Sequence, residues 1–156
     1  MKISDYLTRD LVEIDLKSAA SKTEIFMQLL KTAHSHNKII DKKIALEGLL
    51  ERERLGSTGV GKEIAIPHTG IADCKTIIPV IGIIKNGMAF ESIDDIPVKI
   101  VFMILFPEND VTLQLRFLAR VSRLLRKEEL RKELIKSDSP ERIIEIFRSY
   151  EDKHFG

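Results

Sequence analysis

This sequence has little cysteine, no long apolar run and almost no excess of either charge. The 156 residues include one cysteine, Cys74, which excludes an internal disulfide and is compatible with a reducing compartment. No apolar run approaches the roughly 20 residues that span a bilayer, and the N-terminus lacks the continuous apolar region of a signal peptide. With 25 basic and 24 acidic side chains, the chain has no electrostatic footprint for nucleic acid or an anionic membrane. These absences predict a soluble, cytoplasmic protein without direct membrane insertion.

The composition that is present is typical of a globular domain. Hydrophobic residues make up 44% of the chain and charged residues 31%, and the length suits one domain rather than two. Strand-like and helix-like patterns are interspersed along the chain, which favours the α/β class, with one sheet and helices packed against both of its faces. We expect residues 1–156 to form a single domain with a frayed tail from about Glu151.

Apolar stripes and capping residues predict the helices. They are expected at residues 21–37, 41–53, 113–125 and 130–135 and from residue 139, with one helical turn at residues 3–7. The first long helix opens with the capping-box pair Ser21 and Glu24, and the second with Asp41 as its cap. Ser139 followed by Pro140 opens the last helix.

Four apolar segments are predicted to be strands. They cover residues 11–16, 64–66, 76–84 and 98–106. The near-continuous apolarity of the last segment predicts the centre of the sheet. Pro79 indicates that the third segment begins at an edge or a bulge, and Asn86-Gly87 predicts a turn after it.

The residues with chemical potential concentrate between Arg52 and Thr69. Three of the eight glycines fall between positions 56 and 61, where the sequence reads Gly-Ser-Thr-Gly-Val-Gly. A loop of this composition can point successive backbone N–H groups into one concavity, which suits an anion such as phosphate. The predicted phosphate-binding residues are Ser57, Thr58, Gly59 and Gly61.

His68 is the candidate nucleophile. An imidazole with its unperturbed pKa of about 6.5 is largely unprotonated near pH 7, and Pro67 limits where this side chain can point. A phosphorylated imidazole is also a reactive donor, which suits the relay of phosphate between proteins. The alternative is an ordinary histidine at the start of a loop.

The polar residues before His68 each have two interpretations. Arg52 can hold a phosphoryl group through a bidentate fork, or it can be a solvated charge within the charged run of residues 51–54. Ser57 and Thr58 can donate hydrogen bonds to a phosphate, or they can only shape the turn.

Nucleotide and metal binding are both disfavoured. Residues 56–62 match the P-loop pattern through the lysine, but Glu63 stands where a hydroxyl would bind Mg²⁺. The order of elements is also reversed, since here a helix precedes the glycines and a strand follows them. His34 and His36 point away from each other on a helix and so do not share an ion. We take Cys74 as structural.

Together, the residues from Arg52 to Thr69 resemble a known active-site signature. Arg-Glu at 52–53, Ser-Thr-Gly-Val-Gly at 57–61 and Ile-Ala-Ile-Pro-His-Thr at 64–69 look like the signature of the fructose/mannitol type of enzyme IIA. These proteins belong to the bacterial phosphoenolpyruvate-dependent phosphotransferase system. The resemblance covers nearly the whole chain and is strongest to the nitrogen-regulatory branch. It implies a mixed sheet flanked by helices, and neither a metal nor another cofactor.

The resemblance also implies a partner and a role for each matched residue. His68 would accept a phosphoryl group from the phosphocarrier protein HPr, which enzyme I charges from phosphoenolpyruvate. Arg52 and loop N–H groups would stabilise the phosphoryl oxygens, and Ser57 and Thr58 match the family's loop hydroxyls. The family commonly has a second active-site histidine in a His-Leu-x-x-Leu setting. Gln114 takes that place here, with an amide that can donate a hydrogen bond but cannot become cationic.

Several functions follow from this interpretation. In a regulatory phosphocarrier, phosphorylation of His68 would change binding to a target protein. In a sugar-specific IIA, the phosphoryl group would pass to a separate IIB domain during fructose/mannitol-type uptake. The sequence has no IIB or membrane segment, which favours regulation. The remaining alternatives are an unphosphorylated protein-binding module of the same fold and the disfavoured P-loop nucleotide binder.

Overall fold

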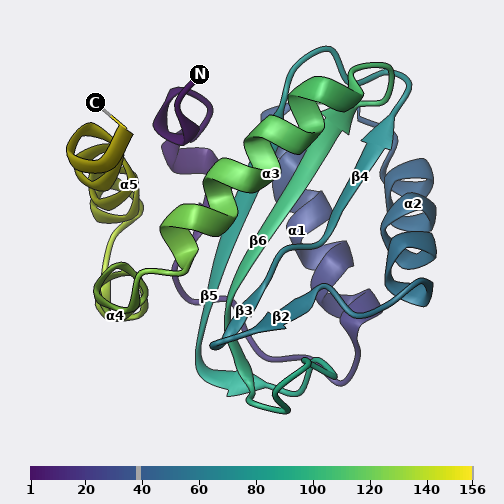
Figure 1. The fold of residues 1–156 in the computed structure, drawn as a ribbon. Coiled ribbons are helices and arrows are strands. Elements are labelled where there is room, and N and C mark those ends of the chain that lie inside the picture. The colour runs from purple at the N-terminus through teal and green to yellow at the C-terminus, as the bar shows by residue number, and fades with distance from the viewer. Residues whose placement is uncertain (38–39, 156) are drawn as a thin grey trace.

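A mixed sheet, six-stranded over the described residues 1–37 and 40–155, organises this computed structural model (Figure 1). The strands are β1 (Val12–Glu13), β2 (Gly59–Gly61), β3 (Ile64–Ala65), β4 (His68–Ile71), β5 (Ile78–Met88) and β6 (Val98–Pro107). Their order is β1-β5-β6-β3-β2, and β4 pairs with β6 beyond the end of β3. The predicted α/β architecture, including the mixed sheet implied by the family resemblance, is confirmed.

Helices cover both faces of the sheet (Figure 1). The chain forms short 3-10 helices η1 (Ile3–Asp5) and η2 (Arg9–Leu11) and α-helices α1 (Lys22–His36), α2 (Lys42–Arg54), α3 (Val111–Leu125), α4 (Glu128–Lys136) and α5 (Pro140–Phe155). One buried cluster lies between the sheet and the pair α1 and α2, and a second lies between the sheet and α3, α4 and α5. None of the helices in the described residues combines the length and the apolarity needed to cross a membrane.

The strand β6 lies at the centre of the sheet, as its apolarity predicted. It pairs with β5 along one edge and with β3 and then β4 along the other. At its start, β5 is paired along one edge only. Pro79 pairs with Ile104 on β6, whereas β1 pairs along the opposite edge only with Ile81 and Gly82. The expectation of an edge position for Pro79 is therefore confirmed.

The predicted caps begin three of the helices. The Asp41 carboxylate accepts hydrogen bonds from two N–H groups of the first turn of α2, and Ser139 Oγ accepts one from the start of α5. Ser21 Oγ accepts the N–H of Glu24 at 3.3 Å. The capping box is only half formed, since the Glu24 carboxylate accepts the N–H of Ala20 rather than that of Ser21.

Three further expectations differ from the structure. Of the strand predicted at residues 11–16, only Val12–Glu13 forms one, because Leu11 ends the 3-10 helix η2. Asn86-Gly87 is not a turn, because β5 continues to Met88 through a register shift at which Gly87 adopts a positive φ of 73°. That conformation suits glycine, which has no Cβ. At the C-terminus, where a frayed tail was expected, α5 continues to Phe155, and Glu151 is fully buried.

Candidate functional site

His68 begins β4 beside the central strand β6. It pairs with Ile104, and its ring meets that of Phe106 edge to face with 6.5 Å between the ring centroids. Phe106 belongs to the buried cluster beneath α3, so the imidazole lies on the α3 face of the sheet. Since side chains alternate along a strand, Gly70 faces the same way and Thr69 the opposite way. The first turn of α3 lies next to β4 (Figure 1).

The hydrogen bonding of His68 determines which ring nitrogen can react. Nδ1 lies 2.8 Å from the carbonyl oxygen of Ile66. A carbonyl oxygen only accepts, so Nδ1 must carry the proton, and the lone pair of the neutral ring is on Nε2. Burial lowers the pKa of His68 below its ordinary value and the charge of Arg52 lowers it further, while the Ile66 carbonyl and Glu53 act in the opposite direction. The lowered pKa favours the neutral form of the ring near pH 7, in which Nε2 carries a lone pair.

Arg52 lies in the last turn of α2 and is half-buried. Its Nη1 donates a hydrogen bond to the carbonyl oxygen of Gly56 at 2.9 Å, which fixes the guanidinium at the start of the following loop. A guanidinium has five N–H donors, so this bond is compatible with further hydrogen bonds to an anion. Because its charge influences the pKa of His68, the structure brings Arg52 and His68 into one electrostatic environment.

Glu53, next to Arg52, has a role that the sequence did not reveal. Its side chain is only 7% exposed. Oε1 accepts hydrogen bonds from both the N–H and the hydroxyl of Thr58, and Oε2 lies 2.9 Å from Nζ of Lys22. Nothing in the charged run of residues 51–54 distinguishes this buried glutamate from its solvated neighbours, since its partners come from other segments.

The two loop hydroxyls are engaged within the protein. Ser57 Oγ donates to the carbonyl oxygen of Phe90 at 3.0 Å and accepts the N–H of Gly59. Thr58 is 2% exposed and donates its hydroxyl proton to Glu53. Each hydroxyl has one proton, and each proton is already donated. In this structure both side chains therefore shape the turn, and a hydrogen bond from either hydroxyl to a phosphoryl group stays a prediction.

Gly59 and Gly61 form a hairpin rather than the expected concave loop. They lie on β2, which pairs antiparallel with β3. The turn residues Lys62 and Glu63 have φ values of 56° and 70°, the left-handed values of a two-residue type I′ turn. The register places Gly61 four residues along β6 from the position that pairs with His68, a separation of about 13 Å. This separation argues against a phosphate-binding role for Gly61.

Gln114 lies in the first turn of α3, over β4. Its Nε2 donates to the carbonyl oxygen of Pro107 at 2.9 Å. A Cβ atom added to Gly70 would lie 3.1 Å from that Nε2 and 2.9 Å from Cα of Glu108, so only glycine permits this close approach of strand and helix. Gly70 and His68 share a face of β4, which puts the Gln114 amide on the same side of the sheet as the imidazole.

His34, His36 and the cysteine bond to nearby protein groups, while the His154 ring stacks on that of Tyr150 in α5. His34 Nδ1 lies 3.1 Å from the carbonyl oxygen of Ile40, and His36 pairs with Asp10 at 2.8 Å. Cys74 is buried, and its burial raises the pKa of its thiol, as suits a structural residue. Within residues 1–37 and 40–155, no three histidine, cysteine or acidic side chains gather as metal ligands.

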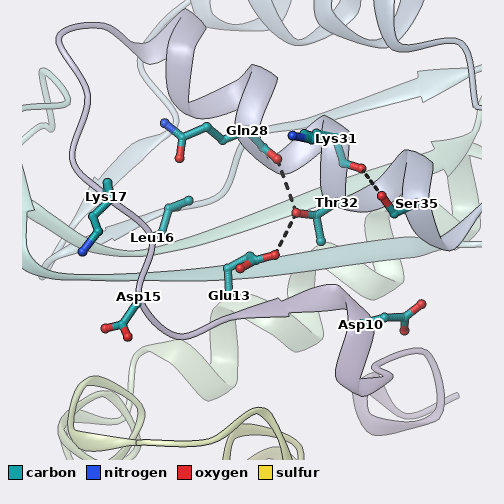
Figure 2. Close-up of a pocket in the computed structure, with 9 residues that line it drawn as sticks. All are labelled: Asp10, Glu13, Asp15, Leu16, Lys17, Gln28, Lys31, Thr32 and Ser35. Carbon is teal, nitrogen blue, oxygen red and sulfur yellow. Dashed lines mark hydrogen bonds between the residues drawn. The ribbon is translucent and has the colours of Figure 1, made fainter.

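A separate hollow of about 420 Å³ lies between α1 and the segment around β1 (Figure 2). Its lining residues are Asp10, Glu13, Asp15, Leu16, Lys17, Gln28, Lys31, Thr32 and Ser35. Three acidic and two basic side chains line it, and the Thr32 hydroxyl is already within bonding distance of Glu13 Oε1 and the Gln28 carbonyl. It contains none of the predicted site residues.

The chain matches a family model over residues 5–150. The model describes the "Phosphoenolpyruvate-dependent sugar phosphotransferase system, EIIA 2" family. The chain belongs to this family. The EIIA 2 match spans every candidate residue from Arg52 to Gln114, together with the sheet that positions them.

Relatives within the EIIA 2 family have two kinds of name. The "PTS system fructose-specific EIIABC component" of Bacillus subtilis is 33% identical over 97% of this chain, which spans only 24% of that longer relative. The "Nitrogen regulatory protein" of Bradyrhizobium diazoefficiens is 32% identical, over 94% of both chains.

Among solved structures, the nitrogen regulatory protein IIA-Ntr of Neisseria meningitidis matches with a TM-score of 0.85 and 26% identity, over 93% of this chain and 98% of that one. The IIA mannitol protein of Escherichia coli has a TM-score of 0.75 and 21% identity, over 90% and 98%, and so supports the fold alone.

Proposed function

We propose that this EIIA 2 domain is a phosphocarrier that accepts a phosphoryl group on Nε2 of His68 from the phosphocarrier protein HPr. The observation that carries the proposal is the 2.8 Å hydrogen bond from Nδ1 of His68 to the Ile66 carbonyl, which leaves the lone pair of a neutral imidazole on Nε2. Membership of the EIIA 2 family supports the choice of a phosphoryl group as the electrophile. The transfer would take place in the cytoplasm, the compartment predicted from the sequence.

The transfer is an in-line displacement at phosphorus. The Nε2 lone pair attacks the phosphorus atom, and the bond between phosphorus and the donor breaks with its electron pair going to the donor. The imidazole gains positive charge as the N–P bond forms. Nδ1–H remains bonded to the Ile66 carbonyl, whose partial negative charge stabilises that developing charge.

Arg52 and Gln114 are proposed to stabilise the phosphoryl oxygens. Arg52 supplies a permanent positive charge from the end of α2, held by Gly56. The Gln114 amide nitrogen has a second N–H besides the one donated to Pro107, and it can donate this one to an oxygen atom. An amide supplies no charge. Gln114 therefore contributes less to stabilising the phosphoryl group than the cationic histidine that the family commonly has.

The regulatory function is supported by a relative of similar length. The match to the Bradyrhizobium nitrogen regulatory protein spans 94% of that protein and 94% of this chain. In this reading, phosphorylation adds close to two negative charges at His68 and changes the binding of a target protein.

The sugar-specific function has its own support. Fructose-specific relatives from Bacillus subtilis and Haloferax volcanii are 33% and 31% identical. A solved complex pairs a mannitol IIA with a phosphorylated IIB, which makes a IIB domain the alternative partner. Incubating the phosphorylated protein with a fructose IIB domain separates the two functions, because only a sugar-specific IIA should transfer its phosphoryl group at a useful rate.

Intact mass spectrometry tests the phosphocarrier proposal. After incubation with phosphoenolpyruvate, enzyme I and HPr, the wild type should gain one acid-labile phosphoryl group and His68→Ala none. A wild type that gains nothing, beside a competent control IIA in the same mixture, would favour the unphosphorylated binding module instead.

A further inference from the structure

Lys22 is a largely buried lysine at a helix N-terminus, where a positive charge is unfavourable. It is the first residue of α1, where the helix dipole opposes a positive charge. Its side chain is only 19% exposed, and its ammonium group lies 4.8 Å from the centroid of the Phe90 ring. Such a position indicates that specific contacts hold the charge there.

Those contacts lead to Glu53. Nζ of Lys22 lies 2.9 Å from Oε2 of Glu53, 3.4 Å from Oγ of Ser57 and 3.7 Å from the exposed carboxylate of Glu91. The pair of Lys22 and Glu53 therefore ties the start of α1 to the end of α2 and to the loop that follows. The Glu53 carboxylate is the more buried partner, at 7% exposure.

From Glu53, a continuous series of hydrogen bonds reaches the imidazole. Oε1 of Glu53 accepts the N–H of Thr58 at 3.0 Å. The Thr58 carbonyl oxygen accepts the N–H of Ile66 at 2.9 Å, and the Ile66 carbonyl oxygen accepts Nδ1–H of His68 at 2.8 Å. The backbone that orients the nucleophile thus depends on where the Glu53 carboxylate is held.

The negative charge of Glu53 is unfavourable for phosphoryl transfer to His68, and the positive charge of Lys22 offsets it. A carboxylate near His68 raises the pKa of the imidazole and repels an incoming phosphoryl group, which itself carries close to two negative charges. Both effects oppose transfer. A paired ammonium group offsets the negative charge and leaves the hydrogen bonds of Glu53 to Thr58 unchanged.

We infer that Lys22 is a positioning residue for phosphoryl transfer, acting through Glu53 and not on the phosphoryl group itself. It neutralises the carboxylate and fixes it on Thr58, so that the backbone behind His68 stays in place without a net negative charge beside the site. This inference rests on the proposed role of His68 as phosphoryl acceptor.

The test uses Lys22→Gln, which can still donate a hydrogen bond to Glu53 but has no charge. NMR titration of the unphosphorylated protein should show a higher pKa for His68, and phosphorylation by phospho-HPr should slow by about tenfold. Lys22→Arg restores the charge and should restore both values. Lys31→Met is the matched control, because it removes one exposed positive charge from the same helix and should change neither value.

Glu53→Gln distinguishes action through Glu53 from other effects. Alone, it should lower the pKa of His68. The Lys22→Gln, Glu53→Gln double variant should have the same His68 pKa as the Glu53→Gln single variant. The double variant contains no unpaired buried charge, so it remains a valid test if Lys22→Gln alone is poorly folded.

Three results would overturn the inference. One is a folded Lys22→Gln variant with an unchanged pKa for His68 and an unchanged phosphorylation rate. Another is a lower unfolding free energy without any change in that pKa, which would make Lys22 structural only. The third is an effect of Lys22 on the pKa that persists without Glu53. A wild type that is not phosphorylated at all would instead refute the phosphocarrier proposal, while the titrations would still test the coupling of Lys22 to Glu53.

Discussion

Replacing Glu151 by alanine should strongly destabilise the protein, although the residue lies only four positions before the end of α5. Its carboxylate is fully buried. Oε2 accepts the N–H of Ile3 at 2.7 Å and Nε of Arg120 at 2.8 Å, and Oε1 accepts the N–H of Ser4 at 2.9 Å. One side chain thereby joins the N-terminal turn η1, the long helix α3 and the last helix α5.

The expected magnitude follows from what the substitution leaves behind. Glu151→Ala removes one partner of a buried ion pair, which typically costs about 3–5 kcal/mol, because Arg120 keeps its charge at only 19% side-chain exposure. Two backbone N–H groups also lose their acceptor. Against a typical total stability of roughly 5–15 kcal/mol this is a large share, and it corresponds to a fall in melting temperature of about 10 °C.

Urea denaturation followed by circular dichroism measures the effect. Glu145→Ala, on the exposed face of the same helix, is the matched control and should change the unfolding free energy by less than about 0.5 kcal/mol. In a double-mutant cycle with Arg120→Met, the coupling energy should be about 1–3 kcal/mol. A Glu151→Ala variant within about 0.5 kcal/mol of the wild type would refute the reasoning and would favour a frayed C-terminal tail.

Three further predictions concern the site and its support. Because burial and Arg52 lower the pKa of His68, an NMR titration should find its midpoint below the ordinary imidazole value, and a midpoint above that value would contradict the assigned environment. Gln114→His should speed phosphorylation or prolong the phosphorylated form by restoring a group that can become cationic, and an unchanged rate and lifetime would mean that position 114 has no such role. Gly48→Ala should destabilise the protein by about 1–2 kcal/mol despite the better helix propensity of alanine, since its Cβ would collide with Thr69 Oγ1. Adding Thr69→Ala should recover most of that loss, and a stabilised Gly48→Ala single variant would show that α2 does not pack this tightly on β4.

The parts of the fold that could be predicted from sequence are those encoded locally. A near-continuous apolar run predicted β6, and the caps Asp41 and Ser139 marked the starts of two helices. A cap or an apolar stripe depends on residues a few positions apart, so one segment contains the whole signal.

The parts that could not be predicted depend on partners from distant segments. Glu53 looked like one charge in a solvated run, and its ion-pair partner Lys22 lies 31 positions away. Glu151 looked like part of a frayed tail, and it bonds to Ile3, 148 positions earlier. For the candidate site, the sequence indicated His68 and Arg52, but whether a loop hydroxyl faces an anion or a buried carboxylate is decided only by the packing of α2 against the loop.

The measurement that tests the central claim most directly is NMR of the ¹⁵N-histidine-labelled protein after phosphorylation by phosphoenolpyruvate, enzyme I and HPr. The hydrogen bond from Nδ1 to the Ile66 carbonyl predicts that the phosphoryl group is attached to Nε2 of His68, with Nδ1 still protonated. Phosphorylation at Nδ1, at another residue, or not at all beside a competent control IIA would contradict the account.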